Sequence, residues 1–313
     1  MKLRAYLLML FVVAVWGSTF VVVKGALADA TPAAFNLARM TLAFAVLGVG
    51  YHRYWRGIQR WQVAAGALVG LCLAVGYQFQ TTGLARTTPS KSAFITGLMV
   101  VMVPLLSTIP GLRPPGCRPP RWNAFLGAAL AFIGIVLLTA PAAAQRSATL
   151  LGQAAHLLPD MKSINLGDIL TLGCATGFAF HCIALSHVSP RIAFQPLALL
   201  QVGFCALFMA LSLPLIEHPQ IAWTPRVVVA LGVSAVFATA IAFSIQSWAQ
   251  SVLPPTHTAL LLTLEPVFAW ITSFLVTGER LGMRPASGAL LILAGIALTE
   301  LMPQPHLPTA HEA

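Results

Sequence analysis

Apolar residues along this chain come in blocks of roughly 18 to 22, the length that a helix needs to cross about 30 Å of hydrocarbon. Short stretches that carry the prolines, glycines and charges separate the blocks. No ten-residue pattern of alternating hydrophobicity recurs, so a transmembrane β-barrel is not expected. The pattern predicts an all-α integral membrane protein with ten transmembrane helices at residues 5–25, 32–50, 62–82, 91–110, 123–141, 167–186, 194–215, 226–248, 256–276 and 285–302.

One polar connection is much longer than the others and divides the spans into two sets of five. It covers residues 142–166 and contains Gln145, Arg146, Asp160 and Lys162. We therefore predict four parts, which are a first repeat at 1–141, a linker at 142–166, a second repeat at 167–302 and a carboxy-terminal tail at 303–313.

The two halves resemble one another in sequence. Adding 166 to residues 66–98 gives an ungapped match that pairs Gln80 with Gln246 and Pro89 with Pro255. A repeat of five spans returns the chain to the opposite side of the membrane, so the second half is expected to be inverted relative to the first. Inverted five-helix repeats recur in secondary transporters, because exchanging the conformations of two like halves exchanges the inward and outward openings.

Composition supports the membrane assignment, since 58% of the residues are hydrophobic and only 8% are charged, against about 25% charged in a soluble domain. The net charge of +10 is not gathered in one basic arm, so nucleic acid is not expected as a partner. With the amino terminus inside, the outer loops of the first half carry only Arg86 and Lys91. Its inner segments carry Lys2, Arg4, Arg53, Arg56, Arg60, Arg113, Arg118 and Arg121. This asymmetry predicts that both termini are cytoplasmic, in a pattern that suits a bacterial inner membrane.

Metal and nucleotide motifs are missing from the sequence. The five cysteines form no Cys-x-x-Cys or Cys/His metal spacing, and no glycine-rich phosphate loop ends in Gly-Lys-Ser/Thr. We expect no cofactor. The cysteines that lie in apolar runs are expected to pack in the protein interior; they are Cys72, Cys174, Cys182 and Cys205.

Four short motifs follow one another along the predicted spans. They are Trp16-Gly17-Ser18-Thr19-Phe20, Arg39 after Pro32, Ala93-Phe94-Ile95-Thr96-Gly97-Leu98, and Leu264-Glu265-Pro266-Val267. In this order they resemble the EamA-type branch of the drug/metabolite transporter superfamily, over nearly the whole chain as two repeats. The resemblance implies a ten-helix transporter whose central cavity is formed by helices of both repeats. It also implies substrates that are amino acids, other small metabolites or drugs, often exported.

Charged residues at membrane depth are the first candidates for a substrate site, because each costs about 2.5 to 3.5 kcal/mol at the centre of a helix and therefore normally faces the bundle interior. Glu265, near the middle of the ninth span, could bind a substrate amine, take up a proton, or form a structural ion pair with a basic residue of another span. Arg39 could bind a substrate carboxylate through its planar guanidinium, tie its span to a neighbour, or extend towards the headgroups.

Amide and aromatic residues complete the candidate substrate-binding set. Gln80 and Gln246 coincide under the repeat and should occupy like places, and amides offer both donors and acceptors to a polar substrate. Hydrogen bonding between helices is the alternative role. The full set is Trp16, Arg39, Tyr77, Gln78, Gln80, Gln246, Trp248 and Glu265. His181 could carry a proton, but we expect a hydrogen-bonded histidine of the core.

These features predict a secondary active transporter, and not an enzyme, that exports small polar metabolites such as amino acids by alternating access. Energy would come from the substrate gradient or from protons as the coupling ion, and a monomer in the lipid bilayer would suffice because two repeats can build a complete pathway. The alternative is a membrane-embedded enzyme of the lipid or prenyl transferase type. Such enzymes usually carry clustered aspartates, whereas Asp29, Asp160 and Asp168 are isolated near span ends. A channel is disfavoured because no filter sequence is present.

Overall fold

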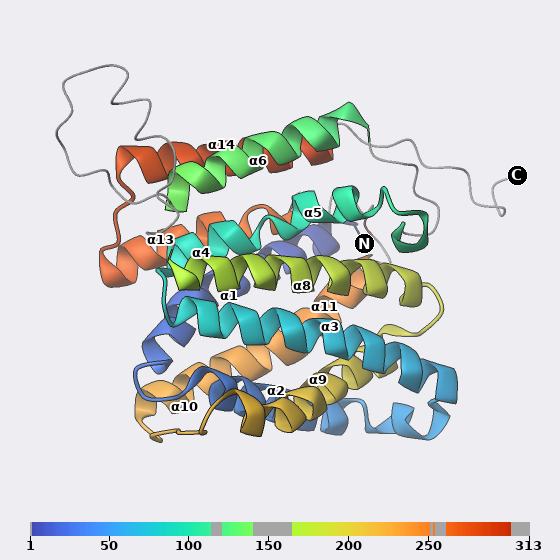
Figure 1. The fold of residues 1–313 in the computed structure, drawn as a ribbon. Coiled ribbons are helices and arrows are strands. Elements are labelled where there is room, and N and C mark those ends of the chain that lie inside the picture. The colour runs from blue at the N-terminus through green and yellow to red at the C-terminus, as the bar shows by residue number, and fades with distance from the viewer. Residues whose placement is uncertain (1, 114–120, 140–164, 251–252, 254–260, 302–313) are drawn as a thin grey trace, which may run out of the picture.

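The computed structural model describes residues 2–113, 121–139, 165–250, 253 and 261–301 (Figure 1). Within these residues the chain is helical and forms no strand, although one isolated antiparallel bridge pairs Ala30 with Ile221. Seven of the described helices are long and apolar enough to cross a membrane, and three further apolar helices are shorter. The protein is therefore an all-α membrane protein.

The first half contains six α-helices and two short 3₁₀ turns among the described residues. They are α1 (Lys2–Ala26), α2 (Pro32–Gly50), η1 (His52–Gly57), α3 (Arg60–Leu84), α4 (Pro89–Thr96), α5 (Met99–Leu106), η2 (Pro110–Leu112) and α6 (Trp122–Thr139). Proline begins α2 and α4, where its fixed φ suits the first turn and its missing N–H costs nothing. The Thr88 hydroxyl accepts the Lys91 backbone N–H and so caps α4.

The second half follows the same order with different interruptions. Its elements are α8 (Leu166–Val188), α9 (Phe194–Ile216), α10 (Pro225–Gly232), the π-helical η4 (Val233–Ile241), α11 (Ala242–Gln250), α13 (Glu265–Thr277) and α14 (Met283–Leu301). Asn165 caps α8 by accepting the Gly167 N–H at 2.8 Å. Gly278 ends α13 with a φ of 71°, a left-handed conformation that favours glycine.

The observed helices follow the predicted spans to within a few residues, except at two interruptions. The span predicted at 91–110 is divided into α4 and α5, which are separated by Gly97 and Leu98. In the span predicted at 256–276, a turn at Thr263 and Leu264 precedes α13, so Glu265 begins a helix and does not lie in the middle of one. Glu265 thus stands inside the predicted ninth span, directly after an interruption of its helix. Residues 254–260, the predicted linker up to residue 164, and the predicted tail at 303–313 lie outside the described residues.

The helices run side by side in a bundle (Figure 1). The pair α6 and α14 lies on one side of the bundle, and α2, α9 and α10 lie on the other. Between them, α3 packs against α8 and α9, and α1 packs against α13 and the η4–α11 segment. Glycine permits the closest of these contacts, since a Cβ on Gly288 of α14 would meet the Gly134 carbonyl oxygen of α6 at 2.5 Å.

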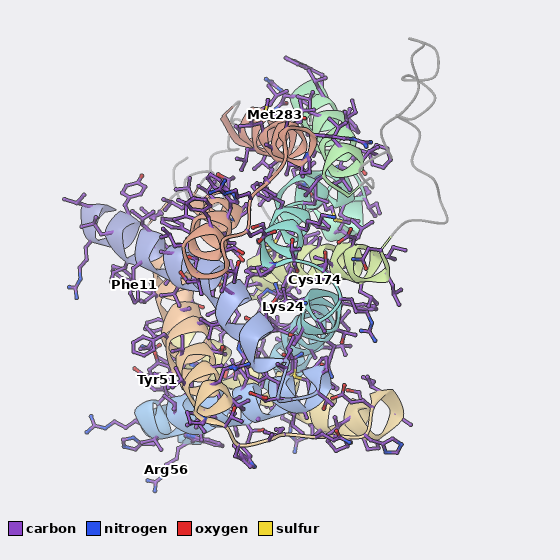
Figure 2. The ribbon with its side chains drawn as sticks, turned by 90° about the vertical axis from the view of Figure 1, so that its left-hand side faces the viewer. Phe11, Lys24, Tyr51, Arg56, Cys174 and Met283 are labelled. Atoms are coloured by element: carbon purple, nitrogen blue, oxygen red, sulfur yellow. The ribbon has the colours of Figure 1, made fainter. Side chains whose placement is uncertain are left out.

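Large apolar side chains cover the outside of the bundle. Figure 2 shows Phe11 on α1 and Met283 on α14 among the side chains that stand out from the helices, and they are 45% and 90% exposed. In water such a surface would be unfavourable, but hydrocarbon solvates it well. Polar groups at membrane depth must therefore be sought inside the bundle, where the candidate site lies.

Candidate functional site

A cavity of about 560 Å³, part of it open to solvent, lies between helices of the two halves. The first half contributes residues of α1, α2, α3, α4 and α5, and the second half contributes residues of α8, α11 and α13. A smaller hollow of about 230 Å³ shares Thr19, Phe20, Arg39 and Gln80 with it and extends to Leu84 at the end of α3.

Most of the residues predicted to bind substrate meet at this cavity. Those in its wall are Trp16, Arg39, Tyr77, Gln80, Gln246 and Glu265. Tyr77 and Gln80 are three positions apart on α3 and thus share a helix face. Gln80 and Gln246, paired by the sequence repeat, both reach the wall from opposite halves.

The structure does not bring Gln78 and Trp248 to the cavity wall. Each lies one or two positions from a lining residue, which rotates it by roughly 100° or 200° around the helix. The Gln78 side-chain oxygen instead accepts a hydrogen bond from Asn36 Nδ2 at 3.0 Å. Trp248 packs against a buried cluster of α1 and α11 that includes Met9 and Ala249. The helix period explains why a run of polar or aromatic residues cannot all face one cavity.

Arg39 is held in the cavity wall by neutral partners. Its side chain is only 3% exposed. Nε donates to Thr239 Oγ1 at 2.9 Å and Nη2 donates to the Tyr77 hydroxyl at 3.2 Å, while Cζ lies 4.4 Å from the centre of the Tyr77 ring. Within the described part of the chain no carboxylate pairs with Arg39. The guanidinium therefore keeps its positive charge at the cavity, where an anionic group can approach it.

Trp16 is fixed by the backbone of the opposite half. Its Nε1 donates to the Ala238 carbonyl oxygen at 2.8 Å, and its ring lies 5.8 Å from that of Phe243. Tryptophan buried at membrane depth needs a partner for its N–H. With that bond made, the indole ring forms an aromatic part of the cavity wall.

Glu265 enters the cavity at the amino-terminal end of α13. Among the described residues its carboxylate makes no hydrogen bond and no ion pair. The positive end of the α13 dipole favours a negative charge at this position. Gly17 of α1 packs directly against this turn, because a Cβ there would meet the Glu265 carbonyl oxygen at 2.6 Å. The structure thus shows no structural ion pair for Glu265 within the part of the chain that it describes.

Two more polar side chains of the second half face the cavity. Gln246 is 5% exposed, and its Oε1 accepts no hydrogen bond from the described residues. His181 is bonded through Nε2 to Gln201 Oε1 at 2.9 Å, as expected for a histidine of the core, yet it also lines the cavity. Within the described residues no group of three or more His, Cys, Asp or Glu gathers closely enough to hold a metal ion.

Several wall residues were not among the predicted ones. They are Thr19, Phe20, Leu73, Thr96, Met99, Phe178, His181, Cys182 and Phe243. Thr19, Phe20 and Thr96 stand inside the motifs on which the family resemblance rested, so the motifs were a signal for them. Phe178 and Phe243 lie in apolar helices beside many other apolar residues, and no feature of the sequence distinguishes them.

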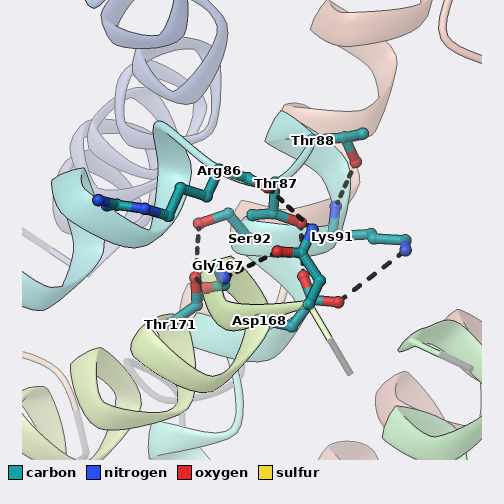
Figure 3. Close-up of polar contacts among 9 residues, drawn as sticks. Arg86, Thr87, Thr88, Lys91, Ser92, Gly167, Asp168 and Thr171 are labelled. Atoms are coloured by element: carbon teal, nitrogen blue, oxygen red, sulfur yellow. Dashed lines mark hydrogen bonds and ion pairs between the residues drawn. The ribbon is translucent and has the colours of Figure 1, made fainter. Parts of the chain in front are cut away.

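Polar contacts join the halves at the end of the bundle where α4 and α8 begin (Figure 3). Asp168, 4% exposed, accepts a hydrogen bond from Thr87 and lies 4.0 Å from Lys91 Nζ. Ser92 and Thr171 hydroxyls lie 3.4 Å apart one turn deeper. Asp168 is therefore bound in a contact between α4 and α8 and does not reach the cavity wall.

Comparisons with known proteins identify the family of the chain. The model of the EamA-like transporter family matches residues 3–140 and again residues 165–301. An Archaeoglobus fulgidus protein named "Uncharacterized transporter" is 30% identical over 300 residues, which are 96% of this chain and 87% of that protein. A second Archaeoglobus fulgidus protein of the same name is 23% identical over 308 residues, covering 96% of this chain and 98% of the relative.

A protein of known crystal structure has a similar fold. The two structures superpose with a TM-score of 0.62 at 19% sequence identity, over 96% of this chain and 98% of the other. At that identity the likeness concerns the fold alone.

Proposed function

Because this chain belongs to the EamA-like transporter family of the drug/metabolite transporter superfamily, we propose that it is a secondary active transporter that moves a small polar metabolite through the cavity by alternating access. One observation carries the proposal. The cavity lies between the two halves and contains one cation, Arg39, and one carboxylate, Glu265, neither of which has an ion-pair partner among the described residues. Charged side chains that have no ion-pair partner at membrane depth are costly, and they mark a substrate or ion path.

The proposed architecture is ten spans in two inverted repeats of five, at 1–141 and 167–302, joined by the linker. Four helix pairings support it. The packing of α1 against α13 corresponds to that of α8 against α4 when the halves are exchanged, and the pairs α2–α9 and α6–α14 each join equivalent spans. The two matches of one family model, in the two halves, also support it. Rocking of like halves about a central site would open it to alternate sides.

The proposed substrate contacts follow from the chemistry of the wall. Arg39 binds an anionic group such as a carboxylate, and Glu265 binds an amine or carries a proton. Gln80 and Gln246 offer donors and acceptors to polar groups, while Trp16 provides an apolar face. This combination fits a zwitterionic metabolite such as an amino acid.

The proposal also covers the membrane, the direction and driving force of transport, and the oligomeric state. The basic residues of the predicted inner loops support an inner-membrane protein with both termini in the cytoplasm. We infer export of substrate, driven by its own gradient or coupled to protons, by a monomer, because both halves of the pathway are present in one chain.

Uptake into proteoliposomes tests the proposal. Labelled amino acids and metabolites are offered with and without a proton gradient to wild type, to Glu265→Gln, and to Asp29→Asn as a control carboxylate that contacts Thr224 and Arg226 away from the cavity. Saturable, gradient-stimulated uptake that is lost in Glu265→Gln and kept in Asp29→Asn is expected. Uptake that survives Glu265→Gln would remove Glu265 from the mechanism. Folded protein that takes up no member of a broad panel would contradict transport of this class and favour the enzyme alternative.

A further inference from the structure

The middle of the predicted eighth span is a π-helix, η4, and two cavity residues of the opposite half bond to it. Trp16 Nε1 donates to the Ala238 carbonyl and Arg39 Nε donates to the neighbouring Thr239 hydroxyl. In a π-helix each N–H reaches five positions back, as Ala242 N–H does to the Phe237 carbonyl. Such segments are rare and frequently occur at functional sites.

Thr239 is itself locked by this local geometry. Its side chain is fully buried, and its hydroxyl donates to the Ser234 carbonyl at 2.8 Å, five positions back. Since the hydroxyl has one proton, committing that proton to Ser234 leaves the oxygen lone pairs for Arg39. The direction of both bonds is thus fixed, with Thr239 as acceptor for the guanidinium.

The bond determines which edge of the guanidinium remains open. Thr239 accepts from Nε and Tyr77 accepts from Nη2, so Nη1 is the nitrogen without a hydrogen bond among the described residues. Arg39 lines both the main cavity and the adjoining hollow. A planar guanidinium anchored at two nitrogens cannot rotate, and a preorganised donor binds an anion better than a mobile one.

The other half of the molecule provides a comparison. Under the offset of 166 residues, Thr239, which is buried behind the cavity wall, aligns with Leu73, which lies in the wall. Leu73 belongs to a buried apolar cluster together with Leu199 and Val202 of α9. The position equivalent to Thr239 in the first half is therefore a leucine, which offers no hydroxyl to a guanidinium.

We propose that Thr239 is the positioning residue for Arg39, and that through it η4 sets the geometry of an anion-binding site for the carboxylate of the substrate. The inference rests on the proposed function and adds to it the residue that orients the anion-binding group and the anionic character of the substrate.

Uptake kinetics of three variants test the inference. Thr239→Val keeps the shape and removes both bonds, Thr239→Ser keeps both bonds, and Ser247→Ala removes another buried hydroxyl of the same span that has no partner among the described residues. The probes are those labelled L-amino acids that wild type takes up, each paired with its decarboxylated amine. A lost bond to a charged donor raises the apparent KM about tenfold or more. We expect this rise in Thr239→Val for the amino acid, no rise for the amine, and near-wild-type KM in the other two variants.

A double-mutant cycle separates positioning from a structural role. Lysine has no equivalent of the Nε donor, so in an Arg39→Lys protein Thr239 has nothing left to position. Adding Thr239→Val to Arg39→Lys should therefore raise KM by less than a further twofold. If Thr239→Val acted by an independent structural effect, its fold-increase in KM would multiply with that of Arg39→Lys. Should Thr239→Val not fold, Thr239→Ala replaces it in the cycle. Equal KM values for Thr239→Val and wild type, or an equal rise for amino acid and amine, would overturn the inference. Failure of wild type to take up any probe would instead contradict the proposed function.

Discussion

The guanidinium of Arg39 lies over the ring of Tyr77, with Cζ 4.4 Å from the ring centre, while Nη2 donates to the hydroxyl of the same tyrosine at 3.2 Å. Both side chains are buried, at 3% and 5% exposure. A desolvated cation–π contact stabilises by about 2 kcal/mol. The tyrosine therefore stabilises the charge without neutralising it, and the positive charge remains available to a ligand.

Substitutions of Tyr77 should separate its two contributions. Tyr77→Phe keeps the ring and loses the hydrogen bond from the charged guanidinium, so we expect the substrate KM to rise about tenfold or more. Tyr77→Leu removes the ring as well and should raise the KM further, because the guanidinium loses the aromatic face that it stacks on. Proteoliposome uptake measures both. A Tyr77→Leu variant no weaker than Tyr77→Phe would contradict a role for the ring.

The contact of α1 with α13 depends on a missing side chain at Gly17. An added Cβ would meet the Glu265 carbonyl oxygen at 2.6 Å and the Ala269 nitrogen at 2.8 Å, which are backbone atoms that cannot turn aside. Gly17→Ala should therefore lower the free energy of unfolding by about 1–3 kcal/mol and displace the start of α13. Equilibrium unfolding in mixed detergent measures the change.

Gly25→Ala is the matched control on the same helix. The nearest atom to its new Cβ would be Arg226 Cδ at 3.8 Å, an ordinary contact. We expect a change in stability within about 1 kcal/mol, in either direction. Equal losses at the two positions would show that packing against α13 is not the reason for glycine at position 17.

Two ion pairs of the described structure differ in burial. Lys91 and Asp168 are 26% and 4% exposed, whereas Arg226 and Asp29 are 60% and 26% exposed (Figure 3 shows the first pair). Arg226→Met should cost less than about 1 kcal/mol of unfolding free energy. Lys91→Met should cost more, towards about 3 kcal/mol, because it leaves a buried carboxylate without its cation.

The same reasoning predicts a rescue of the buried pair. Adding Asp168→Asn to Lys91→Met removes the uncompensated charge and should restore part of the lost stability in the same unfolding measurement. No restoration would show that Lys91 acts through packing of its alkyl chain and not through the charge of Asp168.

Cysteine labelling should report on the cavity in the wild-type protein. Cys182 lines the cavity wall, whereas Cys174 and Cys205 are fully buried. A small charged methanethiosulfonate reagent should therefore modify Cys182 and spare the other two, and a transported substrate should slow the reaction. Peptide mass spectrometry identifies the modified residues. Modification of Cys205 in preference to Cys182, or no protection by substrate, would contradict the assignment of the cavity.

Sequence patterns predicted the helices well because the bilayer imposes a minimum length of apolar helix. The apolar blocks gave the ends of α2 and α9 to within a residue or so. Charge and aromatic character at membrane depth brought attention to Arg39, Glu265 and Trp16, which meet at the cavity. These residues were detectable because each is costly in lipid unless it faces the interior.

Features that depend on three-dimensional contacts could not be predicted in this way. Nothing in Val233–Ile241 marks a π-helix, since its hydrogen-bond register is set by what packs against it. Thr239 is an ordinary residue of an apolar helix until Arg39 is placed beside it. Gln78 and Trp248 were grouped with the cavity because they stand among polar and aromatic residues at the ends of their spans, although the helix period turns them away from it.

Counterflow tests the central claim, alternating access through the Arg39–Glu265 cavity, most directly. Proteoliposomes are loaded with unlabelled substrate, diluted into trace labelled substrate without any ion gradient, and followed over time. Alternating access predicts a transient accumulation of label above equilibrium in wild type, and its loss in Arg39→Met. Label that rises to equilibrium without an overshoot in wild type would contradict the account, because a channel or a leak, unlike a carrier, cannot exchange one bound substrate for another.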